Sequence, residues 1–509
     1  MLPRKLIIIA CCMERWIQIP VGTFGLSTYL RRHGIEHTIV HSHMQSFDQL
    51  RPLIDEWIEE GYSFALVLHW KENTPTFYTF SHYLKARIKD PSDLLCGGIT
   101  AAFFSEEILR DPMLPDIVLR GDPEKAVLDY CQGVPVSDIE NAAYLQDGVP
   151  VLKDITRQLD AETFSSLEFT NYSMLHNEDR FLDAINKRYF HVNVTRGCQA
   201  NCEYCGGSLN ANIRHSNRSK TLVRTTESAV ADIHRLHART RGRFPHVNIH
   251  MDDFWAHYFP VIEQVSQSEI AKGINLSLGD RGIMNLERVK RHLPVFKAFN
   301  KFTFEISPES DDEEQRRILM QGTGKEGYDE DYLMQICEFL TEHQLHAIVF
   351  YTLYNSQDDA DSIFKRLQHF EAMKRRVNRD YITIVCSSFS LDTASDEYCA
   401  LPEPPALKDY GEPDSKFTRI LGNLSYIRNP KDVEILLAAK FQFVLTEMKT
   451  GPAGDSWISK LQFTREDLLG IIRKYDLTKL LHQDFVRSGR YIDFIIEKLG
   501  EITPAGMTE

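Results

Sequence analysis

Short apolar runs alternate with helical stretches along the first 135 residues. The apolar runs cover residues 6–10, 37–41, 64–68, 94–99 and 117–120, and helical patterns cover 25–32, 50–59 and 78–88 between them. Continuous apolar strands separated by helices are typical of a parallel sheet that is covered on both faces. The pattern therefore predicts an α/β fold that begins with a doubly wound, Rossmann-like domain of five strands over residues 1–135.

Glycines follow two of these predicted strands. In doubly wound sheets, ligands bind beyond the carboxyl ends of the strands. Gly97 and Gly98 after the fourth strand, and Gly121 after the fifth, would let a ligand approach the backbone. An ordinary turn from strand to helix explains the same glycines equally well. Residues 136–185 have little sustained periodicity, so we expect a connector there.

A second alternating series starts near residue 190. Apolar runs cover 190–194, 246–250, 274–278, 302–306, 347–351 and 382–386. Amphipathic helices are predicted between them, including 227–241 after the capping candidates Thr225 and Thr226. This pattern predicts a partial (β/α)6 barrel of the TIM type over residues 186–404, with its site at the carboxyl ends of the strands. Beyond Pro405 the alternation fades, and residues 405–509 are expected to form a mostly helical domain.

Composition and charge narrow the class of protein. With 43% hydrophobic and 26% charged residues, the chain has ordinary globular composition. The net charge of -14 disfavours a nucleic-acid partner. No apolar run approaches the roughly 20 residues that cross a bilayer, and the run at 6–10 is too short for a signal peptide. We therefore expect a cytoplasmic protein that has neither a membrane nor a nucleic-acid partner.

The cysteines supply the main candidate chemistry. Ten cysteines are too sparse for a disulfide scaffold, and a close cluster of thiols in a reducing compartment more often holds metal. Cys198, Cys202 and Cys205 form a C-x3-C-x2-C cluster directly after the first strand of the second series. Three thiolates on one loop can bind three irons of a cubane and leave the fourth iron open. The alternative is a zinc-stabilised binding protein, although structural zinc usually takes a fourth Cys or His and the loop contains none.

This loop resembles the hallmark of the radical S-adenosylmethionine (radical SAM) superfamily. The spacing matches, and the aromatic Tyr204 precedes the third cysteine as it does in that family. The resemblance implies a 4Fe-4S cluster whose open iron binds S-adenosyl-L-methionine (SAM). Reductive cleavage would then give a 5'-deoxyadenosyl radical that abstracts hydrogen from an unactivated carbon. The resemblance also implies an electron donor such as flavodoxin or ferredoxin and a small-molecule or peptide substrate. We expect the reaction to belong to specialised metabolite biosynthesis.

The resemblance extends to further positions that would contact SAM. Asp252 and Asp253 follow the second strand, where relatives carry a glycine-rich turn that binds the SAM amino group, and carboxylates would accept hydrogen bonds from an ammonium. Ser307 and Glu309 lie at the end of the fourth strand, where relatives bind the ribose or the methionine part. The SAM-binding residues that the resemblance implies are Tyr204, Gly206, Gly207, Asp252, Asp253, Arg281, Ser307 and Glu309.

The order of the two domains resembles the group of radical SAM enzymes with an N-terminal cobalamin-binding domain. Residues 96–101 and 119–124 look like the fourth and fifth strand ends of that group. The D-x-H-x-x-G loop that supplies a lower cobalt ligand is missing, because residues 11–16 occupy its place and contain no histidine. Several members of the group do without this histidine, so cobalamin remains an open cofactor. A cobalamin-dependent C-methyltransferase is therefore an alternative function.

The fate of the substrate radical depends on its neighbours. A nearby thiol returns a hydrogen atom and gives epimerisation, whereas loss of an electron gives dehydrogenation. Cys386 at the end of the sixth strand is the candidate catalytic donor, with Cys399 in the following loop as a second candidate. Cys11 and Cys12 are expected to be buried small hydrophobes.

Overall fold

The computed structural model describes most of the first 411 residues. The described residues are 3–12, 19–185, 189–240, 245–250, 255–280, 284–312, 314, 316, 329–352, 360–387 and 391–411. Among them, residues up to 349 together with 391–411 form one compact unit, and residues 350–352 and 360–387 belong to a second unit. The predicted helical domain at 405–509 lies outside the described residues beyond residue 411.

The first domain is built on a seven-stranded sheet with the order β2-β1-β3-β4-β5-β6-β7. Its first five strands are parallel neighbours, as predicted. They are β1 (Leu6–Ala10), β2 (His37–His41), β3 (Ser63–Val67), β4 (Leu94–Gly97) and β5 (Ile117–Leu119). Leu6 is aligned with both His37 and Ser63, so β1 lies between β2 and β3. From β1 the chain passes to β2 on one side, whereas from β3 it passes to β4 on the other side. The direction of the strand order reverses between β1 and β3, so this boundary is the topological switch point.

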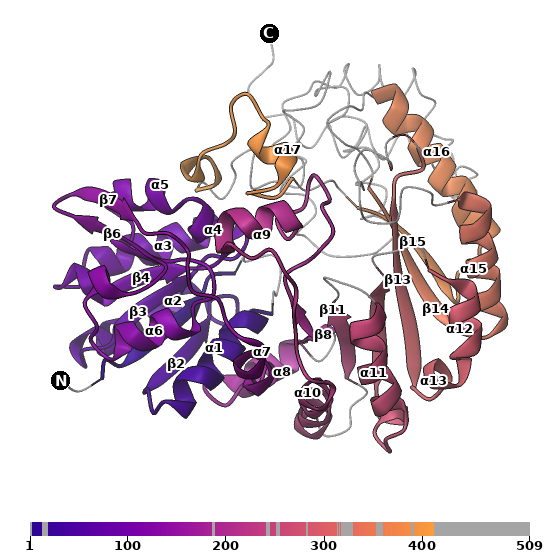
Figure 1. Ribbon diagram of the computed structural model, residues 1–509, viewed down its shortest axis with the longest axis horizontal. Helices are drawn as coiled ribbons and strands as arrows, with labels where there is room; N and C mark the ends of the chain where they lie inside the picture. Colours follow the sequence, from indigo (N-terminus) through magenta and orange to yellow (C-terminus); the bar gives the residue numbers. More distant parts are fainter. Residues whose placement is uncertain are drawn as a thin grey trace, which may run out of the picture. The chain divides into compact units, whose positions relative to one another are not determined.

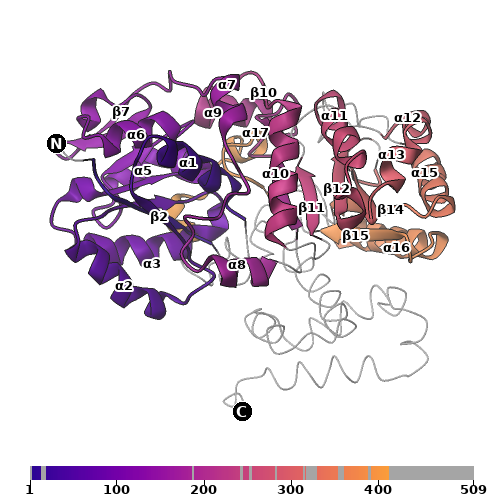
Figure 2. The ribbon, with the colours of Figure 1, turned by 90° about the horizontal axis from the view of Figure 1, so that it is seen from below.

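Helices cover both faces of this sheet, which confirms the doubly wound, Rossmann-like domain. Figure 2 shows α1 (Val21–Arg32) and α6 (Glu124–Cys131) on one side of the sheet and α2 (Phe47–Glu59) and α3 (Thr74–Lys85) on the other. The residues of β1 are all buried, since an apolar strand at the centre of the sheet is packed on both faces. The shorter helices are α4 (Ile99–Phe103) and α5 (Ser105–Arg110), with 3-10 turns at Lys71–Asn73, Pro91–Asp93 and Val136–Asp138.

Part of the segment expected to be a connector extends the first sheet. β6 (Ala142–Gln146) pairs antiparallel with β5, and β7 (Val149–Leu152) pairs antiparallel with β6. Asp147 and Gly148 form the two-residue turn between them, and both have positive φ, which a tight hairpin turn of this kind requires. The remainder of the segment contains α7 (Ala161–Ser166) and α8 (Glu178–Ile185).

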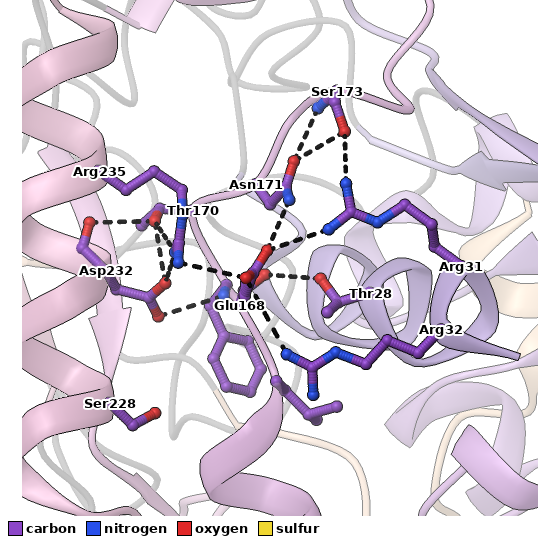
Figure 3. A network of polar contacts seen from close by, with 12 residues as sticks. Thr28, Arg31, Arg32, Glu168, Thr170, Asn171, Ser173, Ser228, Asp232 and Arg235 are labelled. Atoms are coloured by element: carbon purple, nitrogen blue, oxygen red, sulfur yellow. Dashed lines mark hydrogen bonds and ion pairs between the residues drawn. The ribbon is translucent and has the colours of Figure 1, made fainter.

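A polar network centred on Glu168 ties this segment to both flanking domains (Figure 3). The Glu168 carboxylate accepts hydrogen bonds from Asn171 (2.6 Å) and from Arg31 of α1 (3.2 Å), and it forms an ion pair with Arg235 of α10 (Thr226–Arg239; 3.3 Å). Arg235 also forms an ion pair with Asp232 on the same helix. The network therefore links a helix of the Rossmann-like domain to the first long helix of the second domain.

The second domain contains a six-stranded sheet with the order β15-β14-β13-β12-β11-β8 (Figure 1). The strands are β8 (Tyr189–Asn193), β11 (His246–His250), β12 (Asn275–Asp280), β13 (Lys301–Glu309), β14 (His346–Thr352) and β15 (Ile382–Ser387). They match the six predicted strands, and β8, β11, β12 and β13 are parallel in register. Because the spatial order follows the chain and ends at β8 and β15, the sheet is open, as a partial barrel requires.

Helices accompany these strands in chain order. They are α10 (Thr226–Arg239), α11 (Trp255–Ser266), α12 (Leu286–Arg291), α13 (Leu293–Lys297), α15 (Glu330–Glu342) and α16 (Ala360–Arg376), with a 3-10 turn at Ala271–Gly273. Thr225 caps α10 by accepting a hydrogen bond from the backbone of Ser228, as its sequence predicted. In the part of the chain that the structure describes, none of the helices combines the length and apolar character needed to span a bilayer.

Candidate cofactor-binding site

The cysteine loop lies between a short strand and a helix of the second domain. β9 (Thr195–Arg196) pairs antiparallel with β10 (Leu222–Val223), and Gly197 follows with a φ of 89°. A Cβ at Gly197 would approach Arg218 Cδ to 2.8 Å, so only glycine fits here without displacing that side chain. The loop ends at Ser208, whose hydroxyl caps α9 (Leu209–Ser216) by accepting from the backbone of Ala211.

The three cysteines are thiols on this one loop. Cys202 is buried and packs against Ala200, Tyr204 and Cys205, whereas Cys198 and Cys205 are half-buried. The backbone of Ala200 donates to Cys198 Sγ (3.4 Å), and the backbone of Gly207 donates to Cys205 Sγ (3.3 Å). Backbone hydrogen bonds to sulfur stabilise thiolates and tune the potentials of iron-sulfur clusters. This donor set fits a 4Fe-4S cluster. Within the described ranges, no group of three or more His, Cys, Asp or Glu side chains is gathered closely enough to hold a single metal ion.

A segment that follows the second sheet supports the cysteine loop from outside. Asp392 Oδ2 accepts a hydrogen bond from the Gly206 backbone (3.0 Å), and the Asp392 backbone donates to the Tyr204 carbonyl (3.1 Å). A Cβ at Gly206 would lie 2.9 Å from both Asp392 Cβ and the Thr393 carbonyl oxygen. Gly206 is therefore needed for this close approach, and its backbone N–H is used in the hydrogen bond to Asp392.

Asp396 is the centre of a second group of contacts to the same loop. It is the first residue of α17 (Asp396–Cys399) and accepts hydrogen bonds from Asn201 (3.2 Å) and Asn210 (2.7 Å). Arg214 of α9 forms an ion pair with its other oxygen. Burial raises the pKa of Asp396, but the hydrogen bonds from Asn210 and Arg214 outweigh burial and lower it overall. Sequence reasoning missed Asp392 and Asp396, because no local pattern connects residues nearly 200 positions apart.

Arg196, two residues before the first cysteine, joins the loop to the Rossmann-like domain. Its guanidinium lies 3.0 Å from Asp122 Oδ1 and 2.8 Å from Glu124 Oε1, and Arg218 forms an ion pair with the other Asp122 oxygen. The carboxylates of Asp122 and Glu124 are almost completely buried. Burial raises the pKa of Asp122, but Arg196 and Arg218 outweigh this effect and hold the pKa below its usual value. The carboxyl end of β5 thus anchors the cysteine loop through buried, paired charges.

The glycines at the strand ends of the first domain accommodate the protein's own chain. A Cβ at Gly98, whose φ is 108°, would lie 2.4 Å from the Leu68 carbonyl oxygen. A Cβ at Gly121 would lie 2.9 Å from Ile155 Cγ2. Gly98 precedes α4, which packs beside α9 (Figure 1). These contacts favour the turn interpretation of both glycines over close approach of a ligand.

A row of polar side chains crosses the second sheet on the face opposite α13. Phe304 of β13 packs against Phe296 of α13, with ring centroids 5.1 Å apart. Glu305, the next residue, points to the opposite face because side chains alternate along a strand. Its carboxylate accepts a hydrogen bond from Asn248 Nδ2 (2.7 Å), which also donates to Ser277 Oγ (2.7 Å). In a barrel, this face is the interior, and ligands bind at its carboxyl end.

The predicted SAM-binding positions at the end of β13 continue this row. β13 runs through Pro308 to Glu309, so proline does not end the strand early. Ser307 is half-buried between buried Ile306 and Pro308 and shares its parity with Glu305. Glu309 ends the strand with a φ of 66°. Sequence reasoning missed Asn248 and Ser277, because single polar residues inside short strands do not stand out as a pattern.

Three further predicted SAM contacts lie outside the described residues, namely Asp252, Asp253 and Arg281. Cys386 lies on β15, and Cys399 is an exposed thiol at the end of α17.

The two cysteines that directly follow the first strand are buried, as predicted. Cys11 and Cys12 are 2% and 3% exposed, and burial raises the pKa of Cys12 to about 12. At neutral pH its thiol is therefore uncharged, as expected for a small hydrophobe.

Comparisons with known proteins identify the fold. No protein-family model and no curated protein matches the chain. The structure of the radical SAM methyltransferase TsrM from Kitasatospora setae with cobalamin and a [4Fe-4S] cluster has a TM-score of 0.60 at 11% identity, covering 78% of each chain. The same enzyme with tryptophan substrate and the SAM analogue aza-SAM has a TM-score of 0.58 at 12% identity, covering 73% of this chain and 71% of that one.

A second enzyme has the same architecture. The apo structure of OxsB, a cobalamin-dependent SAM radical enzyme, has a TM-score of 0.54 at 10% identity and covers 98% of this chain and 81% of that chain. The fold is therefore that of radical SAM enzymes with an N-terminal cobalamin-binding-like domain.

Proposed function

We propose that this chain is a radical SAM enzyme whose 4Fe-4S cluster is held by Cys198, Cys202 and Cys205. The observation that carries the proposal is the placement of three thiols on one loop directly after the first strand of an open six-stranded sheet. Backbone N–H groups donate to two of the sulfurs, and Asp392 and Asp396 hold the loop from outside. When bound, such a cluster supplies an open iron for SAM and the electron that cleaves it to a 5'-deoxyadenosyl radical.

The protein's own residues divide the remaining work. Arg196 and Arg218 fix the loop to Asp122 at the edge of the Rossmann-like domain. Asn248 and Glu305 present polar atoms on the inner face of the sheet, where hydroxyl and ammonium groups of SAM would find acceptors. Tyr204, Gly207, Ser307 and Glu309, together with Asp252, Asp253 and Arg281, remain proposed SAM contacts. Gly206 remains a proposed contact through its lack of a side chain, since its N–H is bonded to Asp392 and its carbonyl oxygen to His215.

The proposed reaction is hydrogen abstraction from an unactivated carbon of a small metabolite, biosynthetic intermediate or peptide. Dehydration, dehydrogenation or epimerisation would follow, with Cys386 as the candidate hydrogen donor and a flavodoxin or ferredoxin as the electron donor. We place this chemistry in the cytoplasm and in specialised metabolism.

A second candidate function is a cobalamin-dependent C-methyltransferase. The specific observation in its favour is the likeness of the whole two-domain fold to TsrM and OxsB. The parallel sheet of the first domain also has its topological switch point between β1 and β3, where ligands bind in such sheets. A corrinoid bound there would supply a methyl carrier beside the cysteine loop.

The proposal is tested by anaerobic reconstitution with iron and sulfide. We expect about four irons per chain, a broad visible absorption band and SAM-dependent cleavage products. Replacing Cys198, Cys202 and Cys205 by Ala should remove the iron and the products but leave most of the secondary structure. Cys399→Ala, which alters an exposed thiol outside the loop, is the matched control and should retain the iron.

Two results would overturn the assignment. One is a colourless protein with one zinc per chain, which would support the zinc-stabilised binding protein. The other is undiminished SAM cleavage in the triple variant. Cobalt content of the protein purified anaerobically from cells supplied with cobalamin separates the two candidate reactions.

A further inference from the structure

The loop after β3 places an imidazole at the switch point of the first sheet. β1 and β3 are adjacent parallel strands, and the chain continues from their carboxyl ends toward opposite sides of the sheet. Ligands of doubly wound sheets bind at this boundary. The residues that follow β3 are Leu68, His69 and Trp70, so His69 stands two positions beyond the end of the strand.

His69 and Trp70 are both exposed at this edge. Trp70 is 42% exposed, and the two rings meet edge to face with their centroids 4.6 Å apart. The His69 carbonyl oxygen accepts a hydrogen bond from Thr100 Oγ1 of α4 (2.8 Å), which fixes the backbone of the loop. No residue in the described part of the chain makes a hydrogen bond to the His69 ring nitrogens. The ring is therefore positioned by its backbone and by Trp70, and its nitrogens remain available.

The His69 ring is uncharged at neutral pH. Although it reaches solvent, surrounding protein atoms and, to a smaller extent, His215 lower the pKa of His69 to about 4. A neutral imidazole has a nitrogen lone pair and is the commonest metal ligand among side chains. The exposed face of an indole beside it supplies apolar contact area.

The other metal-ligating side chains near the same strand ends are less accessible. Cys11 and Cys12 are buried, and burial raises the pKa of both thiols. His41 at the end of β2 is 2% exposed, and its Nε2 lies 3.6 Å from Cys12 Sγ. An exposed nitrogen donor next to an apolar ring fits a flat macrocycle that carries a metal, which is the chemistry of a corrinoid.

We propose that His69 is the protein ligand to the cobalt of a corrinoid bound at the β1/β3 switch point, with Trp70 packing beside the macrocycle. His69 thereby takes the place of the histidine that is missing from the loop after β1. This inference rests on the corrinoid-binding form of the proposed function and adds the residue that would hold the metal.

The test is the electron paramagnetic resonance (EPR) spectrum of the full-length protein loaded with cobinamide in its cobalt(II) form. Cobinamide lacks the nucleotide base of cobalamin, so a nitrogen ligand to cobalt must come from the protein. We expect each cobalt hyperfine line to split into a triplet in the unaltered protein and to lose this splitting in His69→Gln. His33→Gln is the matched control, because His33 is an exposed histidine at the end of α1, and it should keep the triplet.

Each remaining outcome contradicts the inference in a distinguishable way. A bound corrinoid without triplet splitting, or a triplet that persists in His69→Gln, would show that His69 is not the ligand while leaving corrinoid binding intact. Failure to bind either cobinamide or cobalamin would refute both the inference and the corrinoid-binding form of the function. The cluster proposal would still stand or fall on the iron content of the same preparation.

Discussion

Arg196 Nη2 lies 2.8 Å from Glu124 Oε1, and this ion pair links the cysteine loop to the first helix beyond β5. Arg196 is two residues before Cys198, and Glu124 is the first residue of α6. The Glu124 side chain is 1% exposed, so the charge is stabilised chiefly by its partner. The same contact that anchors the loop therefore makes the Rossmann-like domain part of the proposed cluster site.

Glu124→Gln should destabilise the protein strongly. It leaves the partly buried Arg196 guanidinium without one of its two carboxylate partners, and breaking a pair with a buried carboxylate costs about 3 kcal/mol. We expect this loss in the free energy of unfolding measured with urea. Glu106→Gln is the control, because Glu106 pairs with Arg110 on the surface and should cost less than about 1 kcal/mol. Equal effects of the two changes would contradict the anchoring role.

Asp122 should make stability depend on pH in the acid range. Burial raises its pKa, but Arg196 and Arg218 outweigh burial, so the pKa of the folded state lies below that of the unfolded state. Its stabilisation is therefore complete above the unfolded pKa of about 3.9 and is lost as pH falls through the lower folded value. We expect Asp122→Asn to be less stable at neutral pH and to lose less stability than the unaltered protein on acidification. Parallel acid-unfolding curves for the two proteins would contradict this.

Asp396→Asn should weaken retention of the cluster. Asp396 holds Asn201 and Asn210 of the cysteine loop and its following helix, and loss of outer contacts of this kind reduces metal affinity by about tenfold. The measurement is the rate of iron release to a chelator under anaerobic conditions. Glu403→Gln is the control, since Glu403 is exposed in the same segment and should release iron at the unaltered rate. Indistinguishable rates for both variants would show that the segment does not support the cluster.

Glu305→Gln should weaken SAM binding without removing the cluster. Glu305 accepts from Asn248 on the inner face of the sheet, and a lost hydrogen bond to a charged group corresponds to a Kd raised by about tenfold. Titrating SAM against the EPR signal of the reduced cluster measures this Kd. Glu287→Gln on the exposed side of α12 is the control and should leave the Kd unchanged. An unaltered Kd in Glu305→Gln would remove the polar row from the proposed site.

The strands could be predicted well because each carries its own signal. The run at 6–10 is apolar throughout and forms the fully buried β1, and the run at 246–250 coincides with β11. The C-x3-C-x2-C spacing likewise identifies the cysteine loop within a single stretch of chain. Local propensity and spacing were sufficient for these features because the residues that matter are neighbours in sequence.

The supports of the site could not be predicted because they join distant parts of the chain. Asp392 meets Gly206 and Glu124 meets Arg196, and neither pair is marked by any spacing rule. The hairpin around Asp147 and Gly148 could not be predicted, because its two strands are short and partly exposed. The position of His69 could not be predicted, because a cobalt ligand is expected in the loop after β1, whereas the sheet order brings the loop after β3 to the same edge.

The central claim is that three thiols hold an iron cubane with one open iron. Mössbauer spectroscopy of protein reconstituted anaerobically with 57Fe, before and after addition of SAM, tests it most directly. We predict a cubane spectrum in which one iron of about four changes its parameters when SAM binds. A spectrum without a cubane, or one in which SAM leaves every iron site unchanged, would contradict the claim.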